Sequence, residues 1–155
     1  MKPAWITIDK RTMGRLIPAG LMLLIGGSIY LLMRSPILVL HEWVRRVGLG
    51  TTMDTSRHLV EHIHLPAWVV YCLPGALWAA AYILLIDLIL AQSHAARRFL
   101  VAAFIPLLGI SSEAMQYAGL LPGTFDALDL TAYALPLLAY ALWTIYFPIP
   151  QPINT

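Results

Sequence analysis

The sequence predicts an all-α fold: an integral membrane bundle of four transmembrane helices with an amphipathic helical connection on its outer face. Of the 155 residues, 59% are hydrophobic and only 12% are charged, whereas soluble domains carry about 25% charged residues. Only helices and closed barrels satisfy every backbone polar group in lipid. The two-residue alternation of barrel strands is absent from the sequence, so helices are expected.

Four apolar segments approach the roughly 20 residues that a helix needs to cross a bilayer. They are expected at about 15–33, 66–91, 97–118 and 127–147. Basic residues precede the first segment, but no small-x-small cleavage site follows it, so we interpret it as an uncleaved anchor. In the second segment, the spacing of Gly75 and Ala79 favours close contact with a neighbouring helix, and Pro74 is expected to remove one helical hydrogen bond.

The first connection predicts two short interfacial helices, at about 36–48 and 54–64. Ser35 is a suitable N-cap for the first, Pro36 suits its first position and Gly48 suits its end. About twelve residues are too few to span, so this segment is expected to lie along the membrane surface. Its polar face is predicted to carry His41, Glu42, Arg45 and Arg46.

Basic residues orient the bundle. Four lie in the N-terminal segment and two in the second connection, against four in the first connection and none in the third. This bias favours cytoplasmic N- and C-termini and places the first and third connections on the outer face. The net charge of +2 is too small to suggest a nucleic-acid partner.

The second interfacial helix carries a polar stripe that ends in His58-Leu-Val-Glu61-His62. Two histidines four residues apart on one helical face can share a metal, and a glutamate between them can act as a base. His64, His41 or Asp126 is the candidate third ligand. The alternative interpretation is a solvated helix face at the level of the lipid headgroups, without a metal.

The third connection, "ISSEAMQYAGLLPGTFDALDL", concentrates carboxylates between two apolar segments. Glu113, Gln116 and Tyr117 are expected on one face near the end of the third span. Asp126 and Asp129 open the fourth span, where Asp126 can cap the helix. Ionisable groups inside a membrane are costly and often functional. Glu113 is therefore the main functional candidate, unless it bonds to an outer-face arginine or to a neighbouring helix.

Two further side chains within the spans receive structural interpretations. Asp87 lies near the inner end of the second span and is expected to reach the interface, or to pair with Arg97 or Arg98. Cys72 excludes an internal disulfide because it is the only cysteine. It is expected to be a small apolar filler.

The stretch "EAMQYAGLLPGTFDALD" resembles the VanZ-like family of small polytopic bacterial membrane proteins. The resemblance covers about 25 residues and the layout of spans, and it implies the bacterial inner membrane as location. The family's acidic-amide pair corresponds to Glu113 and Gln116, and its acidic residue in the last helix corresponds to Asp129. The founding member is associated with glycopeptide resistance. In this chain Pro122-Gly123-Thr124-Phe125 replaces the usual arginine-containing turn, and Tyr133 stands where the family tends to have Asn.

Three functions follow as hypotheses. In the first, the outward acidic and amide cluster acts in the cell envelope on a lipid-linked or cell-wall component, with no assigned reaction and no cofactor. In the second, the histidine stripe forms a membrane-embedded zinc-dependent hydrolase. In the third, the chain is an accessory subunit that packs against other membrane subunits. The lipid bilayer is the expected partner in all three.

Overall fold

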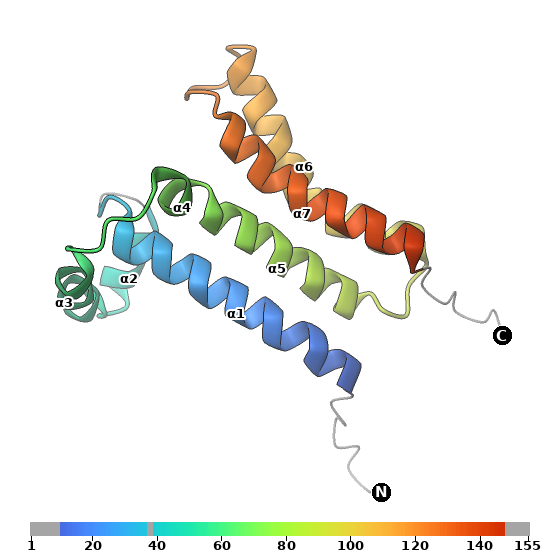
Figure 1. Cartoon of the computed structure of the whole chain (residues 1–155), viewed down its shortest axis with the longest axis horizontal. Helices are drawn as coiled ribbons and strands as arrows, with labels where there is room; N and C mark the ends of the chain where they lie inside the picture. Colours follow the sequence, from blue (N-terminus) through green and yellow to red (C-terminus); the bar gives the residue numbers. More distant parts are fainter. Residues whose placement is uncertain (1–9, 37–38, 148–155) are drawn as a thin grey trace, which may run out of the picture.

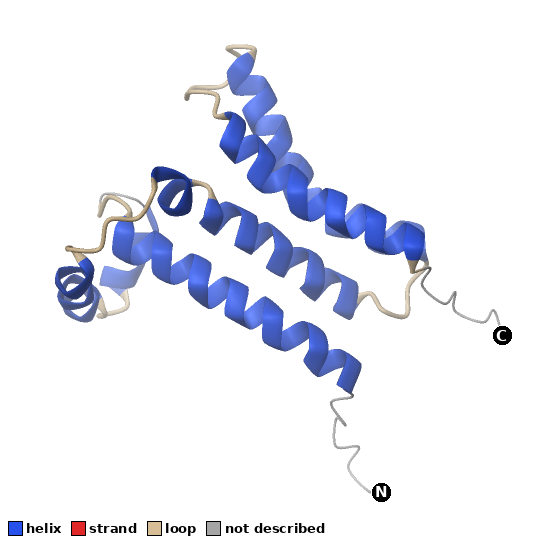
Figure 2. Ribbon diagram, in the orientation of Figure 1, coloured by secondary structure: helices blue, strands red, loops and turns tan. Residues whose placement is uncertain are grey.

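The computed structural model describes residues 10–36 and 39–147, and this part of the chain contains α-helices and no strands (Figure 2). The helices in chain order are α1 (Lys10–Met33), α2 (Val39–Arg46), α3 (Gly50–Val60), α4 (Ala67–Tyr71), α5 (Leu73–Ile89), α6 (Ala95–Tyr117) and α7 (Ala127–Tyr146). The predicted all-α fold is therefore confirmed. The proline-rich tail that follows Phe147 lies outside the described residues.

The long helices α1, α5, α6 and α7 each run antiparallel to the preceding one in this order (Figure 1). α1 packs along α5, and α5 also contacts both α6 and α7, which pair with each other. The start of α1 and the end of α7 lie at the same end of the bundle, while α2, α3 and the α6–α7 connection lie at the opposite end. We call the first the terminal end and the second the connection end.

In the part of the chain that the structure describes, three helices are long and apolar enough to cross a membrane: Thr12–Met33 within α1, α6 and α7. The predicted second span is not one helix. α4 ends at Tyr71, Cys72 adopts φ −103°, and Pro74 occupies the first turn of α5, so the chain is divided between two helices. α5 itself has 17 residues, which is shorter than a typical span.

The first connection contains two short helices, α2 and α3, but their bounds differ from the predicted ones. α2 begins at Val39, after residues 37–38 that lie outside the description. α3 begins at Gly50 rather than 54 and ends at Val60 rather than 64. His41 was predicted on the outward polar face of the first helix, yet it is completely buried beneath Tyr30, with ring centroids 6.1 Å apart. The tertiary contact with α1 overrides the amphipathic pattern at this position.

Two glycines end helices through the same hydrogen-bonding pattern. Gly48, as predicted, ends α2 with φ +81°; its N–H donates to Arg45 O, and the N–H of Leu49 donates to Val44 O. Gly119, with φ +70°, repeats the pattern at the end of α6. Glycine adopts this left-handed conformation without a Cβ penalty, which fixes where each helix stops.

Small residues let large aromatic side chains approach neighbouring helices. A Cβ added to Gly26 of α1 would lie 2.7 Å from Trp78 Nε1 of α5. One added to Gly109 of α6 would lie 2.5 Å from Tyr133 Cγ of α7. The hydroxyl of Tyr133 would lie 3.6 Å from a Cβ at Gly75 of α5, so the predicted close helix contact at Gly75 is present.

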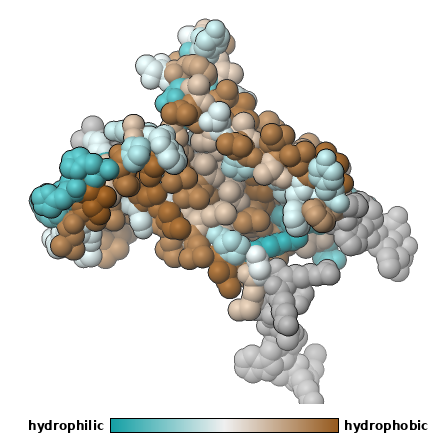
Figure 3. Space-filling view, in the orientation of Figure 1, coloured by the Kyte–Doolittle hydropathy of each residue, from teal (hydrophilic) through white to brown (hydrophobic). Residues whose placement is uncertain are grey.

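The bundle leaves much of its apolar surface uncovered. Leu24, Leu100 and Leu135, on three different helices, are each at least 65% exposed. On the face drawn in Figure 3, hydrophobic residues cover the sides of the helices, and the strongly hydrophilic residues lie towards the ends, with a large group at α3 and a smaller one at the terminal end. Many exposed apolar side chains on long apolar helices are typical of a surface that faces lipid or a partner protein.

Candidate functional site

Glu113 is the buried carboxylate of the connection end, with 7% of its surface exposed. Its Oε2 accepts a hydrogen bond from the backbone N–H of Asp126 at 3.1 Å. Among the two anticipated bonds, the one to a neighbouring helix is therefore present, and no arginine contacts Glu113 within the described residues. The Glu113 carboxylate thereby accepts the N–H group of the residue that precedes α7.

Asp126 is the N-cap of α7, as predicted. Its backbone is extended, and its Oδ1 accepts the N–H of Leu128 at 2.8 Å. One N–H group at the helix start is thereby satisfied by the cap, while the N–H of Asp126 itself is satisfied by Glu113. These two hydrogen bonds, made by Glu113 and Asp126, connect the end of α6 to the start of α7.

Asp129 lies in the first turn of α7 and forms no ion pair within the described residues. The Cys72 sulfur and carboxylate oxygens of Asp126 and Asp129 all lie within 4.8 Å of one another. Cys72 is buried, in agreement with the predicted apolar filler, but its position beside the two carboxylates was not predicted. No sequence signal links it to residues more than fifty positions away; the kink between α4 and α5 brings it there.

Gln116 and Tyr117 lie in different environments. Gln116 is half-buried, its amide reaches Ser112 Oγ at 3.5 Å, and a Cβ at Gly123 would meet its side chain at 3.0 Å. The Gly123 φ of +132° keeps the turn close against Gln116. Tyr117 is 78% exposed and packs edge-on against Phe125. Of the predicted cluster, Glu113 bonds to Asp126 and Asp129 lies beside Asp126, whereas Gln116 packs against the turn.

Arg34 supplies positive charge at the same end of the bundle. Its guanidinium carbon lies 5.1 Å from the centroid of the Tyr30 ring and 5.2 Å from that of Tyr71, the residue before Cys72. A guanidinium between two aromatic faces is held in place and stays charged. Arg34 therefore adds an anchored positive charge to the connection end, which also carries the carboxylates.

The histidine stripe does not form the expected helical metal site. α3 ends at Val60, so Glu61 is its C-cap and His62 lies beyond the helix. His58 Nδ1 and His62 Nε2 lie 3.2 and 3.6 Å from opposite oxygens of the Glu61 carboxylate. All three side chains are more than half exposed. Both histidines contact the carboxylate rather than converging on a common point.

The candidate third ligands of that stripe lie elsewhere. The His64 ring bonds to the carbonyl of His62, and Asp126 belongs to the α7 cap. The buried His41 Nε2 lies 2.9 Å from Leu31 O and 3.1 Å from Arg57 Nη1. Arg57 Nη1 also donates to Leu31 O at 2.6 Å. His41 and Arg57 thus attach α2 and α3 to an unpaired carbonyl at the end of α1.

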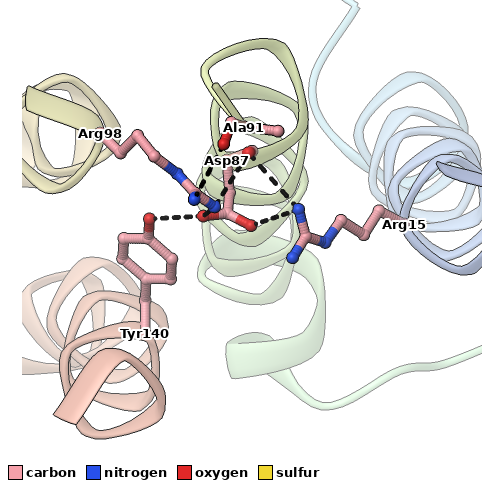
Figure 4. A network of polar contacts seen from close by, with 5 residues as sticks. All are labelled: Arg15, Asp87, Ala91, Arg98 and Tyr140. Atoms are coloured by element: carbon pink, nitrogen blue, oxygen red, sulfur yellow. Dashed lines mark hydrogen bonds and ion pairs between the residues drawn. The ribbon is translucent and has the colours of Figure 1, made fainter. Parts of the chain in front are cut away.

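Asp87 organises a second polar cluster at the terminal end (Figure 4). Its carboxylate pairs with Arg98 and, at 2.7 Å, with Arg15, and it accepts the Tyr140 hydroxyl at 2.8 Å. The predicted pairing with Arg98 is confirmed, whereas Arg15 and Tyr140 were not foreseen. We call these four residues the Asp87 network; it links α1, α5, α6 and α7.

No protein-family model matches the chain, and no curated protein or solved structure is detectably similar to it. The chemistry must therefore be argued from the residues. Carboxylate oxygens and a thiol are metal ligands, and carboxylates also accept hydrogen bonds from hydroxyl and amino groups. Cys72, Asp126 and Asp129 are the side chains that offer such atoms together within the described residues.

Proposed function

We propose that the chain is a four-span membrane protein of the bacterial envelope that binds a lipid-linked or cell-wall component at its connection end. Asp129, with Asp126 beside it, forms the binding surface. The observation that carries the proposal is that Asp129 has no ion-pair partner in the described chain, although it lies within 4.8 Å of two other polar side chains. The stretch that contains it resembles the VanZ-like family.

In this proposal the second of the four spans consists of α4 and α5 together. α5 is held between α1 and α7, both of which are long enough to span. Residues 67–89 taken together reach the length of the other spans. The bundle then has an even number of spans, with both termini in the cytoplasm and the acidic residues outside, in agreement with the bias in basic residues.

We infer that Asp129 is a better functional candidate than Glu113. Glu113 is engaged in holding Asp126, so its loss damages the fold and the site together. Asp129 is half-buried at the surface; its carboxylate lies beside the Cys72 thiol and forms no ion pair within the described residues. A carboxylate here can accept hydrogen bonds from hydroxyl or amino groups of a headgroup at the membrane surface. No reaction is assigned to the site.

The experiment expresses the chain in an envelope-sensitised bacterial host and measures tolerance to a glycopeptide antibiotic. Wild-type protein should raise tolerance, and Asp129→Asn should abolish the gain at an unchanged amount of membrane protein. Asp54→Asn, which removes an exposed carboxylate on α3, is the matched control and should behave as wild type. The same tolerance with wild type and an empty vector, or with Asp129→Asn and wild type, would overturn the proposal.

The number and orientation of spans have a separate test. A fluorescent protein fused after Thr155 should fluoresce, and alkaline phosphatase fused there should be inactive, because both report a cytoplasmic end. Alkaline phosphatase fused within the α6–α7 turn, after Gly123, should be active. An inactive fusion at Gly123 would place the acidic residues inside and contradict the proposed topology.

A further inference from the structure

The Asp87 network contains more positive than negative charge. Asp87 supplies one carboxylate, and two guanidinium groups contact it. With Asp87 ionised, the network has one excess positive charge. Asp87 is 4% exposed and Arg98 2% exposed, so part of this charge is held away from water. An uncompensated charge in such surroundings is costly, and an anion nearby reduces the cost.

The two arginines differ in their free donors. Arg98 donates to the carboxylate and the backbone carbonyl of Asp87 and to the Ala91 carbonyl. Its buried Nε has no hydrogen-bond partner among the described residues. Arg15 uses Nη1 for both of its contacts with Asp87. Its Nε and Nη2 donate to no acceptor within the described residues, and 32% of its side chain is exposed. Arg15 is thus the open edge of an otherwise enclosed network.

The geometry of Arg15 suits a phosphate. Figure 4 shows Arg15 reaching Asp87 from α1, on the side opposite Arg98, with one terminal nitrogen engaged. The remaining edge of the planar guanidinium offers parallel N–H groups, which bind two oxygens of a phosphate at once. A carboxylate on one edge and a phosphate on the other would compensate the excess charge.

We infer that Arg15, held by Asp87, forms a binding site for the phosphate of an anionic phospholipid headgroup at the terminal end of the bundle. Arg15 is the fourth residue of the apolar stretch Thr12–Met33, which has 22 residues; in the proposed membrane placement it lies near the level of the lipid phosphates. The cytoplasmic leaflet is rich in anionic lipids. The inference rests on the membrane placement proposed above, but it does not depend on the acidic residues at the connection end.

The experiment uses the full chain purified in a neutral detergent. Phosphatidylglycerol or phosphatidylcholine with identical acyl chains is added, and retained lipid is counted by native mass spectrometry alongside the unfolding temperature. Phosphatidylglycerol should bind about tenfold more tightly and raise the unfolding temperature more, which is the scale of a charge-assisted contact. Equal retention of the two lipids would overturn the inference.

Variants assign the effect to Arg15. Arg15→Gln should remove the preference for phosphatidylglycerol, and Arg97→Gln, which removes an exposed charge at the same end of the bundle, should keep it. Equal losses in both variants would show general charge attraction and overturn the site. If Arg15→Gln does not fold, Arg15→Lys is the second variant. It keeps a positive charge beside Asp87 but lacks the paired N–H groups of the guanidinium. It should lose most of the preference, and wild-type binding by it would contradict the inference.

A final comparison separates the lipid from a free anion. Inorganic phosphate at millimolar concentration, without lipid, should leave the unfolding temperature nearly unchanged because no acyl chain adds to its binding. Stabilisation by inorganic phosphate equal to that by phosphatidylglycerol would assign the site to a soluble anion and overturn the lipid assignment. Antibiotic tolerance is not measured here, so a failure of this test and a failure of the proposed function remain distinguishable.

Discussion

The Glu113 carboxylate accepts the backbone N–H of Asp126 at 3.1 Å, across the turn that separates α6 from α7. Asp126 in turn caps α7 through Leu128. A buried acidic side chain that sequence reasoning assigned to function is therefore part of the helix connection. The site next to it depends on this connection, because the same turn positions Asp129.

Glu113→Ala should destabilise the protein more than Glu113→Gln. Alanine leaves the Asp126 N–H without an acceptor in a partly buried position, at a cost of about 1–3 kcal/mol, whereas the glutamine amide oxygen can still accept. Thermal unfolding in detergent measures the difference. The exposed Glu61→Ala is the control and should change stability little. Equal destabilisation by the two Glu113 variants would mean that the hydrogen bond contributes nothing.

Asp126→Ala should weaken the start of α7 by about 0.5–2 kcal/mol, the usual cost of removing an N-cap side chain. Asp126→Ser should recover much of this stability because serine also caps. Hydrogen exchange at the amides of residues 127–130 locates the effect. Faster exchange along all of α7, rather than at its first turn, would contradict a local capping role.

Asp87→Ala should be among the most damaging single changes, because it leaves Arg98 buried without a counter-charge. Breaking a buried ion pair by removing one partner costs about 3–5 kcal/mol. Replacing both partners, as in Asp87→Leu with Arg98→Met, should be less damaging than Asp87→Ala alone. A double-mutant cycle by unfolding in detergent measures the coupling. Additive effects of the two changes would disprove the pairing in solution.

Gly26→Ala and Gly27→Ala should differ although the two glycines are adjacent in α1. A Cβ at Gly26 would lie 2.7 Å from Trp78 Nε1, whereas nothing lies within 4 Å of one at Gly27. Gly26→Ala should therefore cost about 1–3 kcal/mol through displacement of Trp78. Gly27→Ala should be neutral or stabilising by up to about 1 kcal/mol because alanine favours helix. Unfolding temperatures of both variants, measured in one detergent, provide the comparison.

The sequence by itself determined the helical class and the approximate positions of α1, α6 and α7, because long apolar segments must satisfy their backbone hydrogen bonds internally. It also determined the ends that depend on a local conformation, namely the Asp126 cap and the left-handed Gly48. These features depend only on residues that are close together in the sequence. They could therefore be predicted without knowledge of which helices meet.

The tertiary structure decided what depends on contacts between distant segments. It turned His41 inward under Tyr30, ended α3 before His62, divided the second apolar segment at Cys72 and joined Arg15 and Tyr140 to Asp87. Hydrophobic periodicity indicates which side of a helix is shielded from water. In an apolar surrounding both sides can be apolar, so the pattern does not indicate which side packs against another helix. The partners of a polar side chain there follow from helix packing, which the local pattern does not specify.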